Sequence, residues 1–316
     1  MKTVRIITNY GNSGKLFRQT PQSQGIWGEY SFTNRRVTDC DYVVVMNYSN
    51  HGERVLCNEK NVWCLQQEPH NEYFRVYHKY APEVYARVFT PDESLKGPRY
   101  VHSHGALPWH VERSYDDLKK NILPEKERNL SIVTSSKQIF RGHKARMGFL
   151  KSIAGRIDVD VFGYGIRPLL DKWDGLAPYR YSIVIENFSS AHYWTEKLAD
   201  CYLSWTLPFY YGCKNLSQYF PSESFVSIDI KKPDEALSII EDTINENMWK
   251  KRLDAISQAR ELILEKYQLF PFLTEYIAEW DNKNGHNDKK IIVIPGENSL
   301  PRHLFFSAIR VFRYFR

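Results

Sequence analysis

The hydrophobic positions in the first half of the chain form short runs separated by polar turns. Unbroken apolar runs of four or five residues are typical of strands that are buried on both faces of a parallel sheet. Three runs are clear and a fourth is weaker, in the order 4–8, 42–46, 62–65 and 86–90. We therefore expect a parallel sheet in this half.

A second series of runs begins at residue 130, and helical patterns lie between them. Strands are predicted at 130–136, 157–163, 181–187, 207–212 and 224–230, and helices at 143–154 and 196–205. Strands that alternate with helices indicate two α/β units in tandem. The charged, proline-containing stretch 121–130 is typical of a linker. We predict one domain over 1–125, a second over 126–280, and a polar linker with a tail over 281–316.

The last residues, 300–316, contain four arginines and no acid. At about 100° per residue the arginines fall within an arc of about 120°, and apolar residues fill the opposite side. The arginines are Arg302, Arg310, Arg313 and Arg316. This pattern predicts a basic amphipathic helix on an anionic membrane surface. The alternative is a terminal helix packed on the domain body.

Composition narrows the class of protein. A net charge of +6 and a pI near 8.9 fit anionic ligands or an acidic membrane, but are too weak and scattered to favour nucleic acid. Five cysteines without a C-x-x-C pair suggest neither a disulfide framework nor a zinc site. Reduced thiols and the early polar residues of the N-terminus lead us to expect a cytoplasmic protein, peripheral on the inner face of the cell membrane.

Three short motifs do not support the chemistry that they suggest. "GNSGK" (11–15) lacks the glycine spacing and the Ser or Thr of a phosphate loop. "DVD" (158–160) looks like a metal-binding acid pair, but it lies within an alternating strand, so exposed strand acids are the simpler interpretation. "HSH" (102–104) has no acids or cysteines nearby and makes a weak metal site.

Lys197 occupies an unusual place. It lies in the first turn of the helix predicted over 196–205, where the helix dipole disfavours a cation, and Thr195 can cap that helix. The helix follows a strand of a parallel sheet, and the carboxyl edge of such a sheet is where α/β folds bind ligands. We interpret Lys197 as part of an anion site at a helix N-terminus. A solvated lysine neutralised by Glu196 is the alternative.

The stretch "YRYSIVIEN…YWTEKLADCYLSWTLPFYYG…YFPSESFVSI" (179–228) resembles the signature of glycosyltransferase family 10, the α-1,3/4-fucosyltransferases. That family shows Tyr-Lys-Phe, Phe-Glu-Asn, Thr-Glu-Lys and a proline-bearing strand ending in glycine, in this order. Arg180, Tyr181 and Ile185 depart conservatively from the pattern. The first half of the chain resembles the family only in its pattern of strands.

The resemblance implies an α/β fold of two Rossmann-like domains facing a cleft, the GT-B type, with C-terminal helices. It implies an inverting transferase that moves L-fucose from GDP-fucose to a hydroxyl of a glycan acceptor, free or lipid-linked, in a linkage of the α-1,3 type. The family needs no metal in its site, so cationic side chains would carry the phosphate charge.

Residue roles follow from the same resemblance. Lys197 and Arg146 would contact the phosphates, and Glu196 would stabilise charge on the sugar. The donor pocket would also include Glu186, Asn187, Tyr193 and Tyr164. His143 and Lys144 would contribute only to the local field.

Glu68 is the candidate base, although Gln67 and Pro69 replace both neighbours of the family's glutamate. Glu72 and Glu59 are nearby alternatives for this role. Two other functions stay open: the same chemistry with another nucleotide sugar, or a non-catalytic sugar-binding relative.

Overall fold

The computed structural model describes residues 1–8, 13–70, 82–284 and 288–296. By its contacts the chain divides into two units. The first comprises Met1–Phe17, Gln24–Gly105 and Thr274–Arg316, and the second comprises Arg18–Ser23 and Ala106–Leu273. This division differs from the boundaries expected near 125 and 280, because 106–125 joins the second unit and 274–280 joins the first. The amphipathic stretch 300–316 and Glu72 lie outside the described residues.

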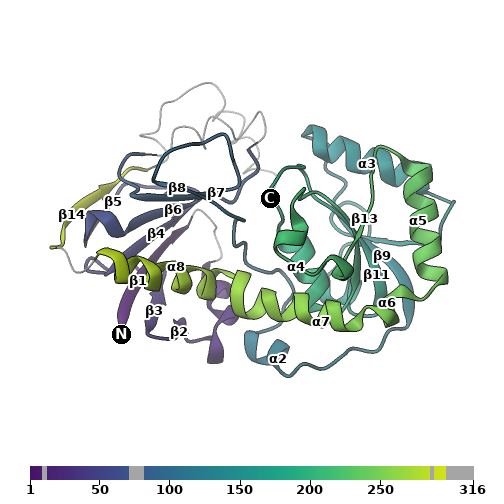
Figure 1. Ribbon diagram of the computed structural model, residues 1–316, viewed down its shortest axis with the longest axis horizontal. Coiled ribbons are helices and arrows are strands. Elements are labelled where there is room, and N and C mark those ends of the chain that lie inside the picture. Colours follow the sequence, from purple (N-terminus) through teal and green to yellow (C-terminus); the bar gives the residue numbers. More distant parts are fainter. Residues whose placement is uncertain (9–12, 71–81, 285–287, 297–316) are drawn as a thin grey trace. The chain divides into compact units, whose positions relative to one another are not determined.

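The first unit is built on a mostly parallel sheet of seven strands (Figure 1). All four runs predicted as strands are present, as β1 (Lys2–Thr8), β4 (Tyr42–Met46), β6 (Val62–Leu65) and β7 (Arg87–Thr90). They pair in the order β1-β4-β6-β7, in parallel. The strands not predicted are β2 (Ile26–Trp27), β3 (Tyr30–Thr33) and β8 (Tyr100–His102), and β2 is antiparallel to β3. Short helical turns are η1 (Ser13–Gln19) and η3 (Glu59–Asn61), whereas η2 (Pro21–Ser23) belongs to the second unit.

Segments distant in sequence supply much of this unit's core. The later part of α8 (Leu269–Asn284) contacts the sheet through aromatic side chains, with ring centroids 6.1 Å apart for Trp63 and Trp280. An antiparallel ribbon of β5 (Glu53–Cys57) and β14 (Lys290–Ile294) contributes Val55, Ile292 and Ile294 to a cluster with the strands. Part of the linker that we expected to begin at residue 281 is regular structure, because α8 continues to residue 284 and β14 begins at residue 290.

The second unit has a parallel sheet in the order β10-β9-β11-β12-β13, and it contains all five strands predicted after residue 130. Their bounds are β9 (Arg128–Val133), β10 (Asp160–Phe162), β11 (Tyr179–Ile185), β12 (Leu207–Tyr211) and β13 (Val226–Ser227). The α-helices are α2 (Tyr115–Lys119), α3 (Arg141–Ile153), α4 (Glu196–Leu203), α5 (Pro233–Asn245), α6 (Met248–Lys251) and α7 (Leu253–Leu262). Shorter helical turns are η4 (Lys172–Gly175), η5 (Leu216–Gln218), η6 (Ser222–Ser224) and η7 (Ile263–Tyr267).

Helices cover both faces of this sheet (Figure 1). Because alternate side chains of a strand point to opposite faces, neighbouring residues of β11 belong to two different cores. Ile183 and Ile185 of β11 belong to a core with α3 and α5. Val184, between them, belongs to a second core with α4 and α7. The segment 106–125 adds Trp109, Val111 and Leu118 to that second core, which explains why it belongs with this unit.

Helix α4 follows the sequence prediction except at its end. Thr195 caps it, since its side chain accepts a hydrogen bond from the backbone N–H of Lys197. The helix ends at Leu203 rather than at residue 205, because Trp205 adopts a left-handed backbone with φ of 59°. Within the described ranges, no helix is long and apolar enough to span a bilayer.

A buried lysine closes the far end of α4. Lys126 donates to the carbonyl of Ser204 at 2.8 Å and to Oγ1 of Thr206 at 3.1 Å. A cation at a helix C-terminus is favourable, but burial lowers the pKa of Lys126 to about 7. The unfolded chain therefore holds one more proton than the folded chain between pH 7 and the ordinary lysine pKa.

This difference predicts that stability rises with pH above neutrality. Between pH 7 and 9 the Lys126 contribution to the free energy of unfolding should increase by about 2 kcal/mol. We expect Lys126→Met to remove this part of the pH dependence in urea unfolding at the two pH values. Equal slopes for the variant and the wild type would contradict it.

Candidate functional site

The second sheet has a topological switch point beside β9. Its neighbours β10 and β11 lie on opposite sides of it, so the connections that leave β9 and β11 diverge at their carboxyl ends. Open α/β sheets bind ligands in the crevice that such divergence creates. Ser135 follows β9, and Glu186 and Asn187 follow β11, so the residues predicted for a donor pocket begin at this point.

Arg146 joins the two loops at the switch point. It projects from α3 and is 4% exposed. Its Nη1 donates to Oδ1 of Asn187 at 2.8 Å, and its Nη2 donates to the carbonyl of Ser135 at 3.2 Å. Its Nε is buried and has no hydrogen-bond partner within the described part of the chain. A guanidinium held in this way keeps one donor for an additional acceptor.

The start of α3 lies very close to the same loop. A Cβ atom at Gly142 would stand 1.8 Å from the carbonyl oxygen of Asn187, so only glycine fits there. His143, in the same turn, does not add a cation, because burial and the charge of Arg146 lower its pKa to about 4. A neutral His143 adds no charge to the local field to which we expected it to contribute.

Glu186 is the buried centre of a second group of contacts. Its carboxylate accepts from the backbone N–H of Thr195 at 2.9 Å and from the Thr195 hydroxyl at 2.8 Å. Nζ of Lys197 lies 3.3 Å from it, and the Glu186 side chain has no exposed surface. Burial holds the pKa of Glu186 above its ordinary value, although Lys197 opposes this shift.

These contacts explain a lysine at the wrong end of a helix. Nζ of Lys197 also lies 3.3 Å from Glu196, and the lysine side chain is 21% exposed. Burial disfavours its charge, but Glu186 and Glu196 outweigh burial and raise the pKa of Lys197. The local penalty from the helix dipole is therefore offset by two carboxylates, one of which the sequence alone did not connect to Lys197.

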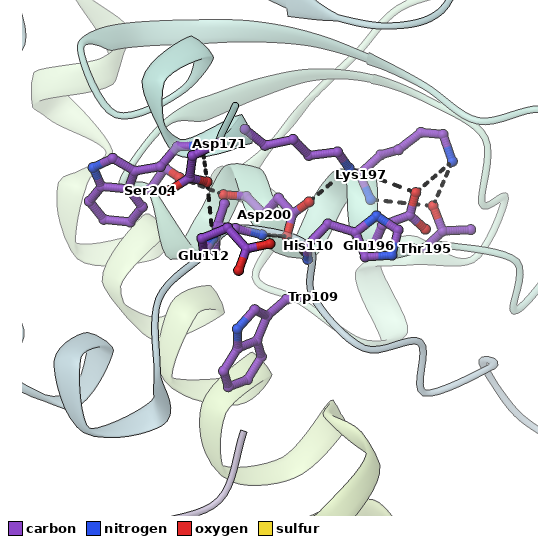
Figure 2. A network of polar contacts seen from close by, with 12 residues as sticks. Trp109, His110, Glu112, Asp171, Thr195, Glu196, Lys197, Asp200 and Ser204 are labelled. Carbon is purple, nitrogen blue, oxygen red and sulfur yellow. Dashed lines mark hydrogen bonds and ion pairs between the residues drawn. The ribbon is translucent and has the colours of Figure 1, made fainter. Parts of the chain in front are cut away.

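A further network extends from the first turn of α4 along the helix (Figure 2). Thr195, Glu196 and Lys197 lie at one end, Asp171 and Glu112 at the other, and Asp200 between them. Oδ1 of Asp200 accepts from the backbone N–H of His110 at 2.7 Å. Sequence reasoning missed Asp200, although an acid four residues after Glu196 falls on the same helix face.

Comparison with known proteins identifies this part of the chain. The family description "Glycosyltransferase family 10 (fucosyltransferase) C-term" matches residues 123–251. Residues 123–251 belong to glycosyltransferase family 10. The match covers the whole second sheet, together with Arg146, Glu186, Lys197 and the loops that connect them.

Individual relatives agree with the family assignment. An alpha-(1,3)-fucosyltransferase of Helicobacter pylori is 34% identical over 82 residues, which are 26% of this chain and 16% of that protein. A 4-galactosyl-N-acetylglucosaminide 3-alpha-L-fucosyltransferase of Gorilla gorilla gorilla is 23% identical over 171 residues, 52% of this chain and 41% of that protein. The chain thus matches less than half the length of these curated relatives.

A solved structure supports the fold class. The crystal structure of an alpha1,3-fucosyltransferase superposes with a TM-score of 0.52 at 15% identity and covers 85% of this chain and 91% of that one. Together with the two parallel sheets, this likeness confirms the predicted α/β fold with Rossmann-like units of the GT-B type.

The remaining candidates of the family 10 unit are less tightly held. Tyr193 is buried in the loop before α4, and its ring centroid lies 6.1 Å from that of Phe188. Tyr164 is 71% exposed, with Nζ of Lys137 5.9 Å from its ring. Arg146 and Asn187 form one group of contacts, and Glu186, Glu196 and Lys197 form a second. The two groups are linked because Glu186 and Asn187 are adjacent in the chain. Within the described part of the chain, Tyr164 contacts neither group.

Glu68 lies in the first unit, half-buried, just after β6. The backbone before it is fixed, since the N–H of Gln67 donates to Oδ1 of Asn47 at 2.8 Å. Glu59 precedes the same strand, so it lies at the amino end of β6 whereas Glu68 lies beyond the carboxyl end. Glu59 also forms an ion pair with Lys290. The geometry therefore disfavours Glu59 as the alternative base.

Asp160 of the "DVD" motif and His102 of the "HSH" motif both contact other residues of the chain. Asp160 forms ion pairs with Arg128 at 2.8 Å and Arg167 at 2.9 Å and accepts from the Tyr179 hydroxyl. His102 contacts the carbonyl of Leu95 through Nε2 at 2.9 Å. Among the residues that the structure describes, no group of three His, Cys, Asp or Glu side chains could hold a metal ion.

Proposed function

We propose that this protein is an inverting glycosyltransferase that moves L-fucose from GDP-fucose to a hydroxyl of a glycan, in a linkage of the α-1,3 type. The family assignment and the names of the fucosyltransferase relatives support this choice of sugar. The observation that carries it is Arg146, which spans the two loops at the switch point and keeps a buried Nε without a partner among the described residues.

The diphosphate of the donor would bind to Arg146 and to the first turn of α4. Arg146 remains charged, and its Nε, which has no partner among the described residues, would donate to a phosphate oxygen. Lys197 is held in place by Glu186 and Glu196 before any ligand arrives, so its charge needs little reorganisation when a phosphate binds. This pair of cations supports transfer without a metal ion.

The reaction would be a single displacement. The acceptor oxygen bonds to the anomeric carbon while the bond from that carbon to the phosphate oxygen breaks, and GDP leaves with the electron pair. Glu68 would take the proton of the acceptor hydroxyl. Glu196, whose pKa is held below its ordinary value by cations that outweigh its burial, would face positive charge on the sugar as an ionised carboxylate.

The donor prediction concerns binding without metal. We expect GDP to bind in EDTA, and we expect Arg146→Ala and Lys197→Met each to weaken binding about tenfold or more, because each removes a charged phosphate contact. Arg146→Lys should recover only part of the affinity, since lysine keeps the charge but cannot bind both loops and the phosphate at once. Calorimetry measures this, with urea unfolding to check the fold of each variant.

Lys232→Met is the matched control, because Lys232 pairs only with the exposed Glu235 on α5 in the described part of the chain. Binding that disappears in EDTA, or equal losses in the control, would overturn the assignment of the phosphate cations. A panel of GDP- and UDP-sugars tests the identity of the donor. Turnover of a sugar other than GDP-fucose would replace GDP-fucose as the assigned donor. Binding without turnover would indicate a non-catalytic sugar-binding relative.

The base prediction separates attack from donor binding. Glu68→Gln should lower kcat by about 10²–10⁴ and leave GDP binding nearly unchanged, since the base acts only on the acceptor hydroxyl. Glu59→Gln, at the amino end of β6, is the control and should keep the wild-type rate. A Glu68→Gln enzyme with near wild-type kcat would refute this role, and Glu72 would be tested next.

We also propose that residues 300–316 attach the enzyme to the inner face of the cell membrane, where a lipid-linked acceptor would be available. Four arginines near an anionic surface would contribute about 1 kcal/mol each. A chain that ends at residue 299 should sediment less with anionic vesicles and keep its rate on a soluble acceptor. Equal sedimentation of the two chains would show that the tail does not bind the membrane.

A further inference from the structure

Asp200 and Lys172 form a buried ion pair next to the proposed site. The Asp200 side chain is 1% exposed, and its two oxygens have different partners. Oδ1 accepts from the backbone N–H groups of His110 at 2.7 Å and Val111 at 3.3 Å. Oδ2 accepts from Nζ of Lys172 at 2.9 Å. A carboxylate fixed by two backbone donors cannot easily turn, so the place of the Lys172 ammonium is fixed too.

The backbone of Lys172 is also held. Asp171, just before it, caps η4, since its Oδ1 accepts from the N–H of Trp173 at 2.9 Å. The same oxygen accepts from the N–H of Glu112 at 3.0 Å, and Oδ2 pairs with Arg113. Asp171 and Asp200 together attach the segment 109–113 to η4 and α4.

Lys172 reaches a second carboxylate. Its Nζ lies 3.9 Å from Oε1 of Glu196, and Nζ of Lys197 lies 3.3 Å from the same oxygen. The two lysines come from different elements, η4 and α4. The other titratable groups that act on this region are Glu186, which shares Lys197 with Glu196, and His110 from the segment 109–113. Burial lowers the pKa of His110 below its ordinary value, which disfavours its charged form.

We propose that Lys172 is a positioning residue for Glu196, and that Asp200 holds Lys172 where it can act. The inference rests on the proposed function, in which Glu196 faces the sugar. Lys197 alone is shared by two carboxylates, so a rotation of Glu196 toward Glu186 would bring two anions together around one cation. Lys172 adds a second cation next to the same Glu196 oxygen, which keeps the carboxylate ionised and in one orientation.

The principal test removes the cation and observes Glu196 directly. Lys172→Met preserves most of the volume, and the Glu196 carboxyl is followed by carbon-13 NMR of glutamate-labelled protein, with Glu196→Gln to assign its resonance. We expect the wild-type Glu196 to stay ionised to a lower pH than Glu196 in the variant, because one of its cations is lost. Lys172→Arg should restore the wild-type titration.

Kinetics supply the second readout. Lys172→Met should lower kcat roughly tenfold, because the Glu196 carboxylate would be misplaced relative to the sugar while every contact with GDP is kept. GDP affinity should change by less than about twofold, which distinguishes positioning from direct phosphate binding.

The single variant leaves Asp200 buried without its cation and could fail to fold. Lys172→Met combined with Asp200→Asn removes both charges and keeps an amide oxygen for the two backbone donors, so it tests the same point in a folded protein. Lys232→Met, remote from this cluster and paired with Glu235, is the control and should leave Glu196 and kcat unchanged.

Each outcome is decisive. An unchanged Glu196 titration in the double variant would overturn the proposal, and so would a loss of GDP affinity as large as the loss of kcat. The NMR titration needs no substrate. If the wild-type protein transferred no fucose while Glu196 still shifted, the proposed function would fail and the link between Lys172 and Glu196 would stand.

Discussion

The second unit depends on one buried carboxylate, that of Glu186 at the end of β11. A carboxylate without exposed surface is costly unless it is paired and fully hydrogen-bonded, and removing its partner typically costs about 3–5 kcal/mol. The sequence meets this requirement within eleven residues, through Thr195 and Lys197. Because Thr195 is also the cap of α4, satisfying Glu186 determines where that helix begins and where Glu196 stands.

The same requirement explains the balance of charge at the site. Lys197 and Lys172 are each held by buried acids, and Arg146 is held by an amide and a serine. None of them depends on a ligand for its position. Fixed cations of this kind stabilise charge that develops during a reaction more effectively than mobile surface lysines, since they need not reorganise.

The sequence predicted best those elements whose signals lie in neighbouring residues, such as the hydrophobic pattern of a strand or the cap of a helix. Apolar runs, together with the alternating stretch 157–163, predicted nine strands, and the position of Thr195 predicted the start of α4. The family motifs over 179–228 pointed to Glu186 and Lys197, and the resemblance added Arg146 from an earlier stretch; the roles of these residues stay predictions.

Long-range contacts could not be predicted in this way. In the sequence, nothing distinguishes Lys172 from a surface lysine. In the structure, η4 places it next to Asp200, which lies 28 residues later in the chain. The segment 109–113 belongs with the second unit because its backbone donates to Asp200 and Asp171 and because Trp109 and Val111 pack in that unit's core. In the first unit, β14 pairs with β5, which lies more than 200 residues earlier in the chain, so no local turn signal could predict this pairing.

The close approach of Gly142 to Asn187 also limits how this protein can diverge. Because no side chain fits between α3 and the loop after β11, a longer loop or a larger residue there would separate Arg146 from Asn187. The contacts that hold Arg146, Lys172, Glu186 and Lys197 all lie within the second unit. Substitutions in the first unit can therefore accumulate without disturbing the contacts that hold these four side chains.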